Sequence, residues 1–201
     1  MIRLAVLLSG RGSNFAAIHE AIQSGELDAK IVGVISNRGD APGIELARHW
    51  GYPAHVFDNR LYASREAHEA DLLRVLDGAK PDYIVLAGYM RLLSSSFVAK
   101  YRGRILNIHP SLLPAFPGVG AQAQAIAARA ANSGCTVHFV DEGLDSGPVI
   151  LQREVDLRPD DDTESLSARI LEQEHIAYSE AINIVLGGNF QSAGRRLEQK
   201  K

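Results

Sequence analysis

Short apolar runs alternate with amphipathic segments along most of this 201-residue chain. The runs that predict strands are Ile2–Leu8, Ile31–Ile35, Ala54–Phe57, Tyr83–Ala87, Ile105–Ile108, Thr136–Val140 and Val149–Val155. Helical patterns cover Asn14–Ser24, Ile44–Trp50, Ser64–Leu76 and a longer closing segment, Thr163–Leu186. Continuous apolar strands separated by helices are typical of a buried parallel sheet with helices on both faces.

The pattern therefore predicts an α/β fold of three layers, α/β/α, around a mostly parallel, Rossmann-like sheet. Val149–Val155 alternates instead and follows the preceding strand after a short polar loop, so the C-terminal part of the sheet should be mixed and partly antiparallel. Nothing in the sequence marks a linker or a repeat, so we expect one domain over residues 1–187. Residues 188–201 are polar and glycine-marked, and we expect them to form a loosely ordered tail.

Composition excludes several classes of protein. Apolar residues make up 46% of the chain and charged residues 22%, which is enough to bury a core. The net charge of −3, with both signs interspersed, argues against nucleic acid or an anionic membrane as the main partner. The single cysteine, Cys135, cannot form an internal disulfide, and no apolar stretch reaches membrane-spanning length. We therefore expect a cytoplasmic protein.

A glycine turn, Ser9-Gly10-Arg11-Gly12-Ser13-Asn14, joins the first predicted strand to the first helix. Glycines allow a tight turn, and the amides of the following helix N-terminus can face an anion. Phe15 replaces the third glycine of the dinucleotide fingerprint, and the lysine of a nucleotide-triphosphate loop is missing. The turn therefore suits a monophosphate, although a purely structural turn capped by Ser13 explains the same residues.

Asn107 and His109 end a predicted strand, and Pro110 stops it. Alternation places both side chains on one face, at the carboxyl end where open α/β sheets bind their ligands. About thirty residues later, the acidic loop Asp141–Pro148 supplies Asp145. An amide, an imidazole and a carboxylate could transfer an acyl group without a covalent intermediate, because the carboxylate favours the imidazolium and the amide holds an oxyanion.

Other interpretations of these residues remain open. A strand-end histidine can be purely structural, and Asp145 before a glycine can simply form a turn. His109, His138 and Asp145 could ligate zinc, but the chain lacks close His-Glu-His or paired-cysteine spacing. Cys135 lies in an apolar strand, which indicates a core residue rather than a nucleophile.

Five segments carry a family resemblance: LLSGRGSN, AGYMRLLS, LNIHPSLLPAFPG, GCTVHFVDEGLDSGPVILQ and QEH. In order and spacing they resemble the phosphoribosylglycinamide formyltransferases of purine biosynthesis. The resemblance covers residues 2–186. It implies the formyltransferase fold and transfer of a formyl group from 10-formyltetrahydrofolate, as co-substrate, to the amine of 5-phosphoribosylglycinamide.

The resemblance also implies roles for individual residues. Asn107, His109 and Asp145 would be catalytic. The ribonucleotide would be bound by Gly12, Ser13, Asn14, Gln173 and Glu174. The folate would be bound by Arg65, Met90, Arg91, Leu92, Leu93, Asn107, Asp141, Glu142, Gly143 and Leu144. No metal is implied, and the expected partners are small-molecule substrates, with no nucleic acid or membrane, for a monomer or weak homodimer.

The sequence departs from the family pattern at two positions. Gln122 stands where many relatives have a histidine, which puts substrate contacts of that loop in doubt, and Ser179 stands where they commonly have proline. Related enzymes with the same catalytic block include other folate-dependent formyltransferases and formyltetrahydrofolate hydrolases. The rival outside this class is a non-catalytic nucleotide-binding or folate-binding module.

Overall fold

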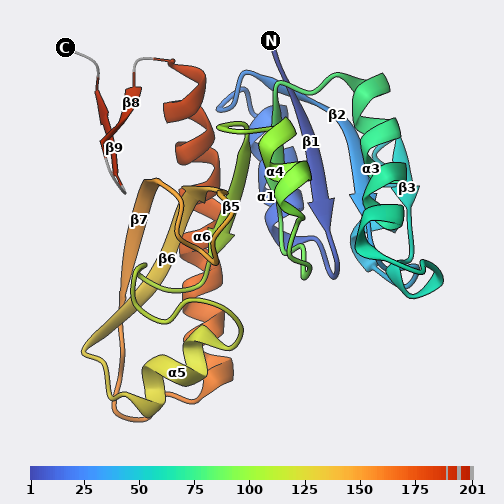
Figure 1. Cartoon of the computed structure of the whole chain (residues 1–201). Helices are drawn as coiled ribbons and strands as arrows, with labels where there is room; N and C mark the ends of the chain where they lie inside the picture. Colours follow the sequence, from blue (N-terminus) through green and yellow to red (C-terminus); the bar gives the residue numbers. More distant parts are fainter. Residues whose placement is uncertain (189, 194–195, 200–201) are drawn as a thin grey trace. The chain divides into compact units, whose positions relative to one another are not determined.

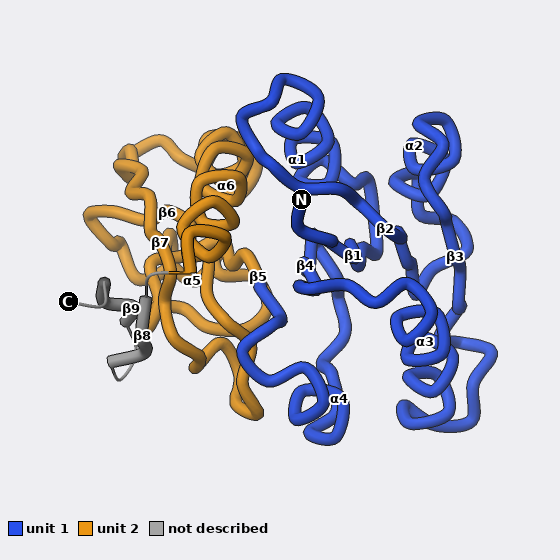
Figure 2. The backbone as a smooth tube through the Cα atoms, turned by 90° about the horizontal axis from the view of Figure 1, so that it is seen from above, with its two compact units in different colours: residues 1–106 blue, residues 107–201 orange. Residues whose placement is uncertain are grey.

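The computed structural model describes residues 1–188, 190–193 and 196–199 (Figure 1). The chain divides into two compact units, residues 1–106 and 107–201, and the division falls within strand β5, Ile105–His109 (Figure 2). The catalytic residues expected from the sequence all belong to the second unit. The glycine turn and Met90–Leu93 belong to the first.

The first unit is built on a parallel sheet in the order β3-β2-β1-β4. The strands are β1 (Ile2–Leu8), β2 (Ala29–Ser36), β3 (Ala54–Val56) and β4 (Tyr83–Leu86). Leu4 to Leu8 of β1 are fully buried, because β1 lies between β2 and β4 with helices over both faces. A strand covered on both faces needs a continuous apolar run rather than an alternating one.

Helices of the first unit begin where the sequence offers a helix start. They are α1 (Ser13–Gln23), α2 (Pro42–His49), α3 (Arg65–Ala79) and α4 (Ser95–Lys100), with a short 3-10 helix η1 (Asn59–Leu61). Pro42 starts α2, and the hydroxyls of Ser64 and Ser94 cap α3 and α4. Figure 2 shows α1 and α2 on one side of the strands and α3 and α4 on the other, so this unit has the expected three layers.

The second unit is mixed, as expected. It contains α5 (Ala121–Ala127), β6 (Asn132–Phe139), β7 (Val149–Asp156), α6 (Thr163–Leu186), β8 (Phe190–Ala193) and β9 (Arg196–Gln199). β6 and β7 pair antiparallel, and α6 packs against both. α6 starts in a capping box formed by Asp162 and Ser165, and it continues unbroken through Ser179.

Several elements differ from the prediction. α4 and α5 were not expected, because helices of six and seven residues are too short for a clear apolar period. β6 begins at Asn132 rather than Thr136, since pairing with β7 extends the strand into residues of low strand propensity. β8 and β9 lie in the segment expected to be a loose tail, and β9 pairs with the edge of β7. Residues 189, 194–195 and 200–201 lie outside the described part.

No helix in the described part of the chain is long and apolar enough to span a bilayer.

Candidate active site

Strand β5 places Asn107 and His109 on the same face, as alternation predicts. His109 is buried, and its Nε2 lies 2.9 Å from the backbone oxygen of Phe116. A carbonyl can only accept, so Nε2 carries a proton and donates to it. The Phe116 backbone has a φ of 53°, in the left-handed region, which turns the chain after Pro110 back toward the end of β5.

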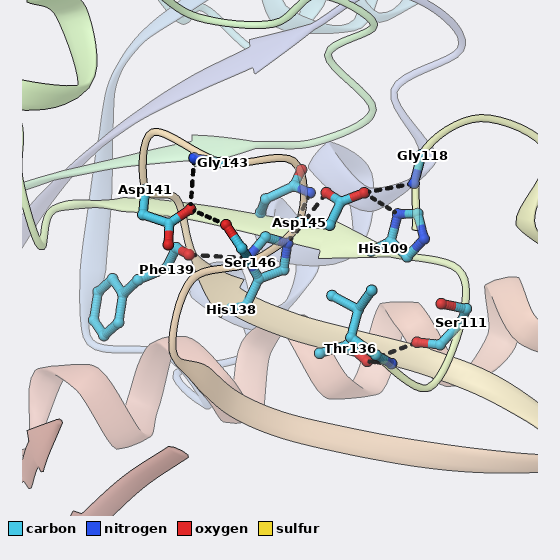
Figure 3. Close-up of polar contacts among 12 residues, drawn as sticks. His109, Ser111, Gly118, Thr136, His138, Phe139, Asp141, Gly143, Asp145 and Ser146 are labelled. Carbon is cyan, nitrogen blue, oxygen red and sulfur yellow. Dashed lines mark hydrogen bonds and ion pairs between the residues drawn. The ribbon is translucent and has the colours of Figure 1, made fainter. Parts of the chain in front are cut away.

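Asp145 faces the other nitrogen of the same imidazole (Figure 3). Asp145 Oδ2 lies 3.4 Å from His109 Nδ1 and accepts a hydrogen bond of 2.8 Å from the Gly118 amide. Only 12% of its side chain is exposed. Both ring nitrogens of His109 therefore face acceptors, and the doubly protonated imidazolium is the form that satisfies both. The backbone of Asp145 has a φ of 48°, a strained conformation that the surrounding loop maintains.

A second histidine, His138, orients Asn107. Its Nδ1 lies 2.9 Å from the Phe139 backbone oxygen and must donate to it, while its Nε2 lies 3.2 Å from Asn107 Nδ2. Burial lowers the pKa of His138, which keeps the ring neutral, so Nε2 accepts from the asparagine amide. This contact fixes which way the Asn107 amide points and engages one of its two amide hydrogens.

Sequence reasoning considered His138 only as a zinc ligand and missed this role. The pairing of β6 with β7 shifts register between Val137 and His138. The extra residue of this irregularity, Ile150, lies in β7, so alternation along β6 is not interrupted. His138 was missed because the pattern of one strand does not show which side chain of a neighbouring strand it contacts. The nearest signal in the sequence is a histidine in the middle of the predicted strand Thr136–Val140.

Zinc is not favoured by the geometry. Asp145 Oδ1 lies 3.7 Å from His138 Nε2, but that nitrogen already accepts from Asn107, and His138 Nδ1 and His109 Nε2 each donate to a carbonyl. Within residues 1–188, no group of three or more His, Cys, Asp or Glu side chains is arranged to hold a metal ion.

The expected folate loop, residues 141–144, is shaped by its own first residue. Asp141 Oδ1 accepts from the Gly143 amide at 3.1 Å and from Ser146 Oγ at 2.6 Å (Figure 3). An aspartate that bonds to the backbone two residues later stabilises a tight turn. Glu142, Gly143 and Leu144 are exposed, with 53% of the Leu144 side chain accessible. The turn therefore presents an apolar side chain directly before Asp145 in the chain.

The expected phosphate loop follows β1 in the first unit. Gly12 has a φ of 78° and immediately precedes α1, whose first turn contains Ser13 and Asn14. Gly12 provides no side-chain cap, and the first amides of an α-helix have no acceptor within the helix. A Cβ on Gly12 would come within 2.9 Å of the Gly43 Cα, so only glycine fits this turn. The geometry suits an anion at the start of α1.

The other expected binding residues occupy different settings. In the first unit, Met90 and Leu92 are 70% and 61% exposed, Arg91 and Leu93 are half-buried beside them, and Arg65 is exposed at the start of α3. In the second unit, Gln173 and Glu174 lie on α6. Gln173 Oε1 accepts from Arg153 Nη1 at 3.3 Å, and Arg153 also pairs with Glu180 at 2.6 Å. Gln173 is thus already held by a cation of its own unit.

Three buried or half-buried histidines predict how folding stability depends on pH. Burial lowers the pKa of His19, His68 and His138, so below the ordinary value of about 6.5 the unfolded chain binds more protons than the folded chain. Folding stability should therefore be fully present above about pH 6.5 and should decrease as the pH falls below it. Urea midpoints measured at about pH 7.5 and 5.5 check this, and a constant midpoint would contradict it. His68→Gln should make the decrease shallower.

Comparisons with known proteins identify similar sequences. A family model described as formyl transferase matches residues 2–182. Phosphoribosylglycinamide formyltransferase from Escherichia coli (strain K12) is 41% identical over 94% of this chain and 90% of its own length. The trifunctional purine biosynthetic protein adenosine-3 of Drosophila melanogaster is 47% identical over 92% of this chain, which spans only 14% of that protein.

Solved structures with the same fold are similar to this chain as well. The crystal structure of glycinamide ribonucleotide transformylase 1 from Symbiobacterium toebii is 45% identical, with a TM-score of 0.96 over 100% of this chain and 95% of the other. The resemblance drawn from the five sequence segments and the expected fold class are both confirmed. The chain belongs to the formyl transferase family.

Proposed function

We propose that the chain transfers a formyl group from 10-formyltetrahydrofolate to the amine of 5-phosphoribosylglycinamide, giving formylglycinamide ribonucleotide and tetrahydrofolate. The observation that carries the proposal is the setting of His109, between the Asp145 carboxylate and the Phe116 carbonyl and two residues after an oriented Asn107. The E. coli relative, at 41% identity over nearly its whole length, supports the choice of substrates.

In this proposal the substrate amine attacks the formyl carbon, and negative charge develops on the formyl oxygen. The second amide hydrogen of Asn107 donates to that oxygen, because His138 engages the first. The His109 imidazolium, stabilised by Asp145, is the second donor. In the structure His109 Nε2 donates to the Phe116 backbone oxygen. To donate directly to the oxyanion, Nε2 must give up this hydrogen bond and form a new one to the formyl oxygen.

One proton must leave the attacking amine, and one must reach the departing folate nitrogen. His109 can hold and pass a proton in both steps, directly or through a water. No step requires a metal-bound nucleophile, since the amine itself attacks. If the reaction nevertheless depended on a metal, a chelator would abolish activity and zinc would restore it.

The binding roles divide between the two units. Gly12, Ser13 and Asn14 at the start of α1 bind the phosphate of the ribonucleotide, and Gln173 and Glu174 on α6 bind its ribose and glycinamide end. The folate is bound by Arg65, Met90, Arg91, Leu92 and Leu93, with Asn107 and the Asp141–Leu144 loop. We further propose that residues 1–187 act as one domain, which is supported by a single family model that runs through residues 2–182.

Partners and location follow from the same proposal. The partners are the two small-molecule substrates, and the protein acts as a monomer or weak homodimer, without nucleic acid or a membrane. Cys135 lies in the core of β6, where burial raises its pKa to about 12, so the thiol is kept neutral. A single neutral thiol suits the reducing cytoplasm.

A formyl-transfer assay that follows folate absorbance tests the function. The proposal expects consumption of 10-formyltetrahydrofolate only when phosphoribosylglycinamide is present. Equal consumption without the amine would indicate a hydrolase, and binding of either ligand without turnover would indicate a non-catalytic module. Consumption with a different amine alone would indicate another formyltransferase.

Arg65 provides a test of folate binding. It is exposed at the first position of α3, so Arg65→Ala should not affect the fold. We expect this change to raise the folate KM about tenfold and to leave kcat nearly unchanged, because it removes binding that ground and transition states share. Arg74→Ala is the matched control, since Arg74 is an exposed arginine of the same helix that pairs with Asp71. A normal folate KM in Arg65→Ala would remove Arg65 from the folate site.

A further inference from the structure

A chain of hydrogen bonds runs through the first unit from the glycine turn to the segment assigned to folate. Ser9, the first residue of the turn, shares a hydrogen bond of 2.5 Å between its Oγ and the side-chain amide of Asn37. The same Ser9 Oγ accepts from the backbone amide of Met90 at 2.8 Å. The Ser9 amide in turn donates to the Gly88 backbone oxygen at 3.0 Å. The start of the phosphate loop and the start of the folate segment are thus bonded to each other.

Asn37 extends this chain to Arg91 through Asn59. The side-chain amides of Asn37 and Asn59 lie 2.8 Å apart, and the Asn59 backbone amide donates to the Asn37 backbone oxygen at 3.1 Å. With the Asn59 side chain turned to satisfy its neighbours, its oxygen accepts from Arg91 Nη1 at 2.8 Å and its nitrogen donates to the Asn37 backbone oxygen at 2.9 Å. The Asn37 amide must then turn as well, so that its oxygen accepts from the Asn59 nitrogen and its own nitrogen donates to Ser9 Oγ. The guanidinium of Arg91 is therefore positioned by an amide, not by a carboxylate.

Topology explains why these residues meet. Ser9 directly follows β1, Asn37 directly follows β2, and Asn59 lies three residues after β3. The three strands are parallel neighbours, so their carboxyl ends lie at the same edge of the sheet. Ser9 and Asn37 are also buried, with 7% and 3% exposed. Buried polar groups are costly when they lose a partner, so this chain has a defined arrangement.

We propose that Asn37 is a positioning residue that couples the two substrate sites of the first unit. Through Ser9 it holds the beginning of the phosphate loop and the Met90 amide, and through Asn59 it holds Arg91. The inference rests on the proposed function, because that function assigns phosphate to the turn and folate to Met90–Leu93. Asn37 itself contacts neither substrate; it acts through Ser9 and Asn59.

The two branches predict different outcomes for two variants. Asn37→Ala removes the side-chain bonds to Ser9 and to Asn59, although the Asn37 backbone oxygen still accepts from Asn59. It should raise KM and the dissociation constant for each substrate by up to about tenfold, with a smaller effect on kcat. Asn59→Ala breaks only the Arg91 branch, so it should weaken folate binding about tenfold and leave ribonucleotide binding within about twofold. Adding Asn59→Ala to Arg91→Ala should cause no further loss of folate affinity, because both changes remove one interaction.

Ser36→Ala is the control. Ser36 precedes Asn37 and is fully buried, but its hydroxyl bonds with the backbone of Arg38 and not with Ser9 or Asn59, so this variant should bind both substrates normally. Calorimetric titration with 10-formyltetrahydrofolate and with phosphoribosylglycinamide gives the dissociation constants without turnover. If wild type binds neither, the proposed function fails. If the wild type binds both substrates and a folded Asn59→Ala protein binds folate normally, the inference is wrong. It is also wrong if Asn37→Ala binds both substrates with unchanged affinity. Should Asn37→Ala not fold, Asn59→Ala alone provides the test.

Discussion

Replacing His109 by alanine is expected to lower kcat for formyl transfer at least about 100-fold at neutral pH, because it removes a charged donor to the developing oxyanion and the group that moves the proton. The structure places a hydrogen-bond or ion-pair acceptor near each ring nitrogen. Phe116 O lies 2.9 Å from Nε2 and Asp145 Oδ2 lies 3.4 Å from Nδ1, so only the imidazolium has a proton for each. Steady-state kinetics at saturating folate and ribonucleotide measure the loss.

The other members of the catalytic set should show related losses. Asn107→Ala and Asp145→Ala should each lower kcat by about 10²- to 10³-fold, as expected when one preorganised donor or its partner is lost. Asp145→Asn should also change the shape of the pH–rate profile, because an amide does not stabilise the imidazolium. The losses should not multiply in double variants, because the three residues act as one unit.

The matched control replaces a histidine outside the site. His49 is exposed at the end of α2, so His49→Ala should leave kcat and both KM values at wild-type levels. A folded His109→Ala protein with near-normal kcat at neutral pH would show that His109 is structural, held by Phe116 only to shape the turn after β5. The catalytic assignment would then be wrong, although the family would stand.

The periodicity of apolar residues was sufficient to predict the helices and strands whose residues must be apolar because they are buried. β1 was predicted from Ile2 to Leu8 because its central residues are covered on both faces and every one must be apolar. α6 was predicted from Thr163 to Leu186 because a long helix has many turns over which its period can be recognised. Alternation along β5 also placed Asn107 and His109 on one face.

Contacts between distant segments were beyond this reasoning. The contact between His138 and Asn107 joins residues 31 positions apart in the chain, and the pattern within either strand does not reveal it. Asn37 was missed for a similar reason. A lone asparagine after a strand is usually a turn residue, and its role emerges only when parallel strand ends bring Ser9 and Asn59 beside it.

Gly147→Ala is expected to destabilise the protein by about 3 kcal/mol or more and to abolish most of its activity. An ideal Cβ at Gly147 would lie 1.8 Å from the Phe139 backbone oxygen and 2.9 Å from the Phe139 backbone carbon. Neither atom can rotate away, so the two ends of the acidic loop must separate. The hydrogen bond of 2.9 Å from the Phe139 amide to the Pro148 oxygen closes this loop and would be strained by the same movement. Asp145, within the loop, would then be displaced from His109.

Variants of two further glycines serve as comparisons for the stability of Gly147→Ala. In Gly143→Ala, the added Cβ would lie 2.1 Å from the hydroxyl of Ser146. The Ser146 side chain can rotate away, so the loss of stability should be smaller than in Gly147→Ala. A Cβ at Gly78, within α3, meets nothing within 4 Å, so Gly78→Ala should leave activity unchanged and raise stability by about 0.5–1 kcal/mol. Urea unfolding of the three variants gives the order Gly78→Ala, Gly143→Ala, Gly147→Ala from most to least stable. If Gly147→Ala unfolds at the wild-type midpoint, the close approach of the loop ends does not hold Asp145 in place.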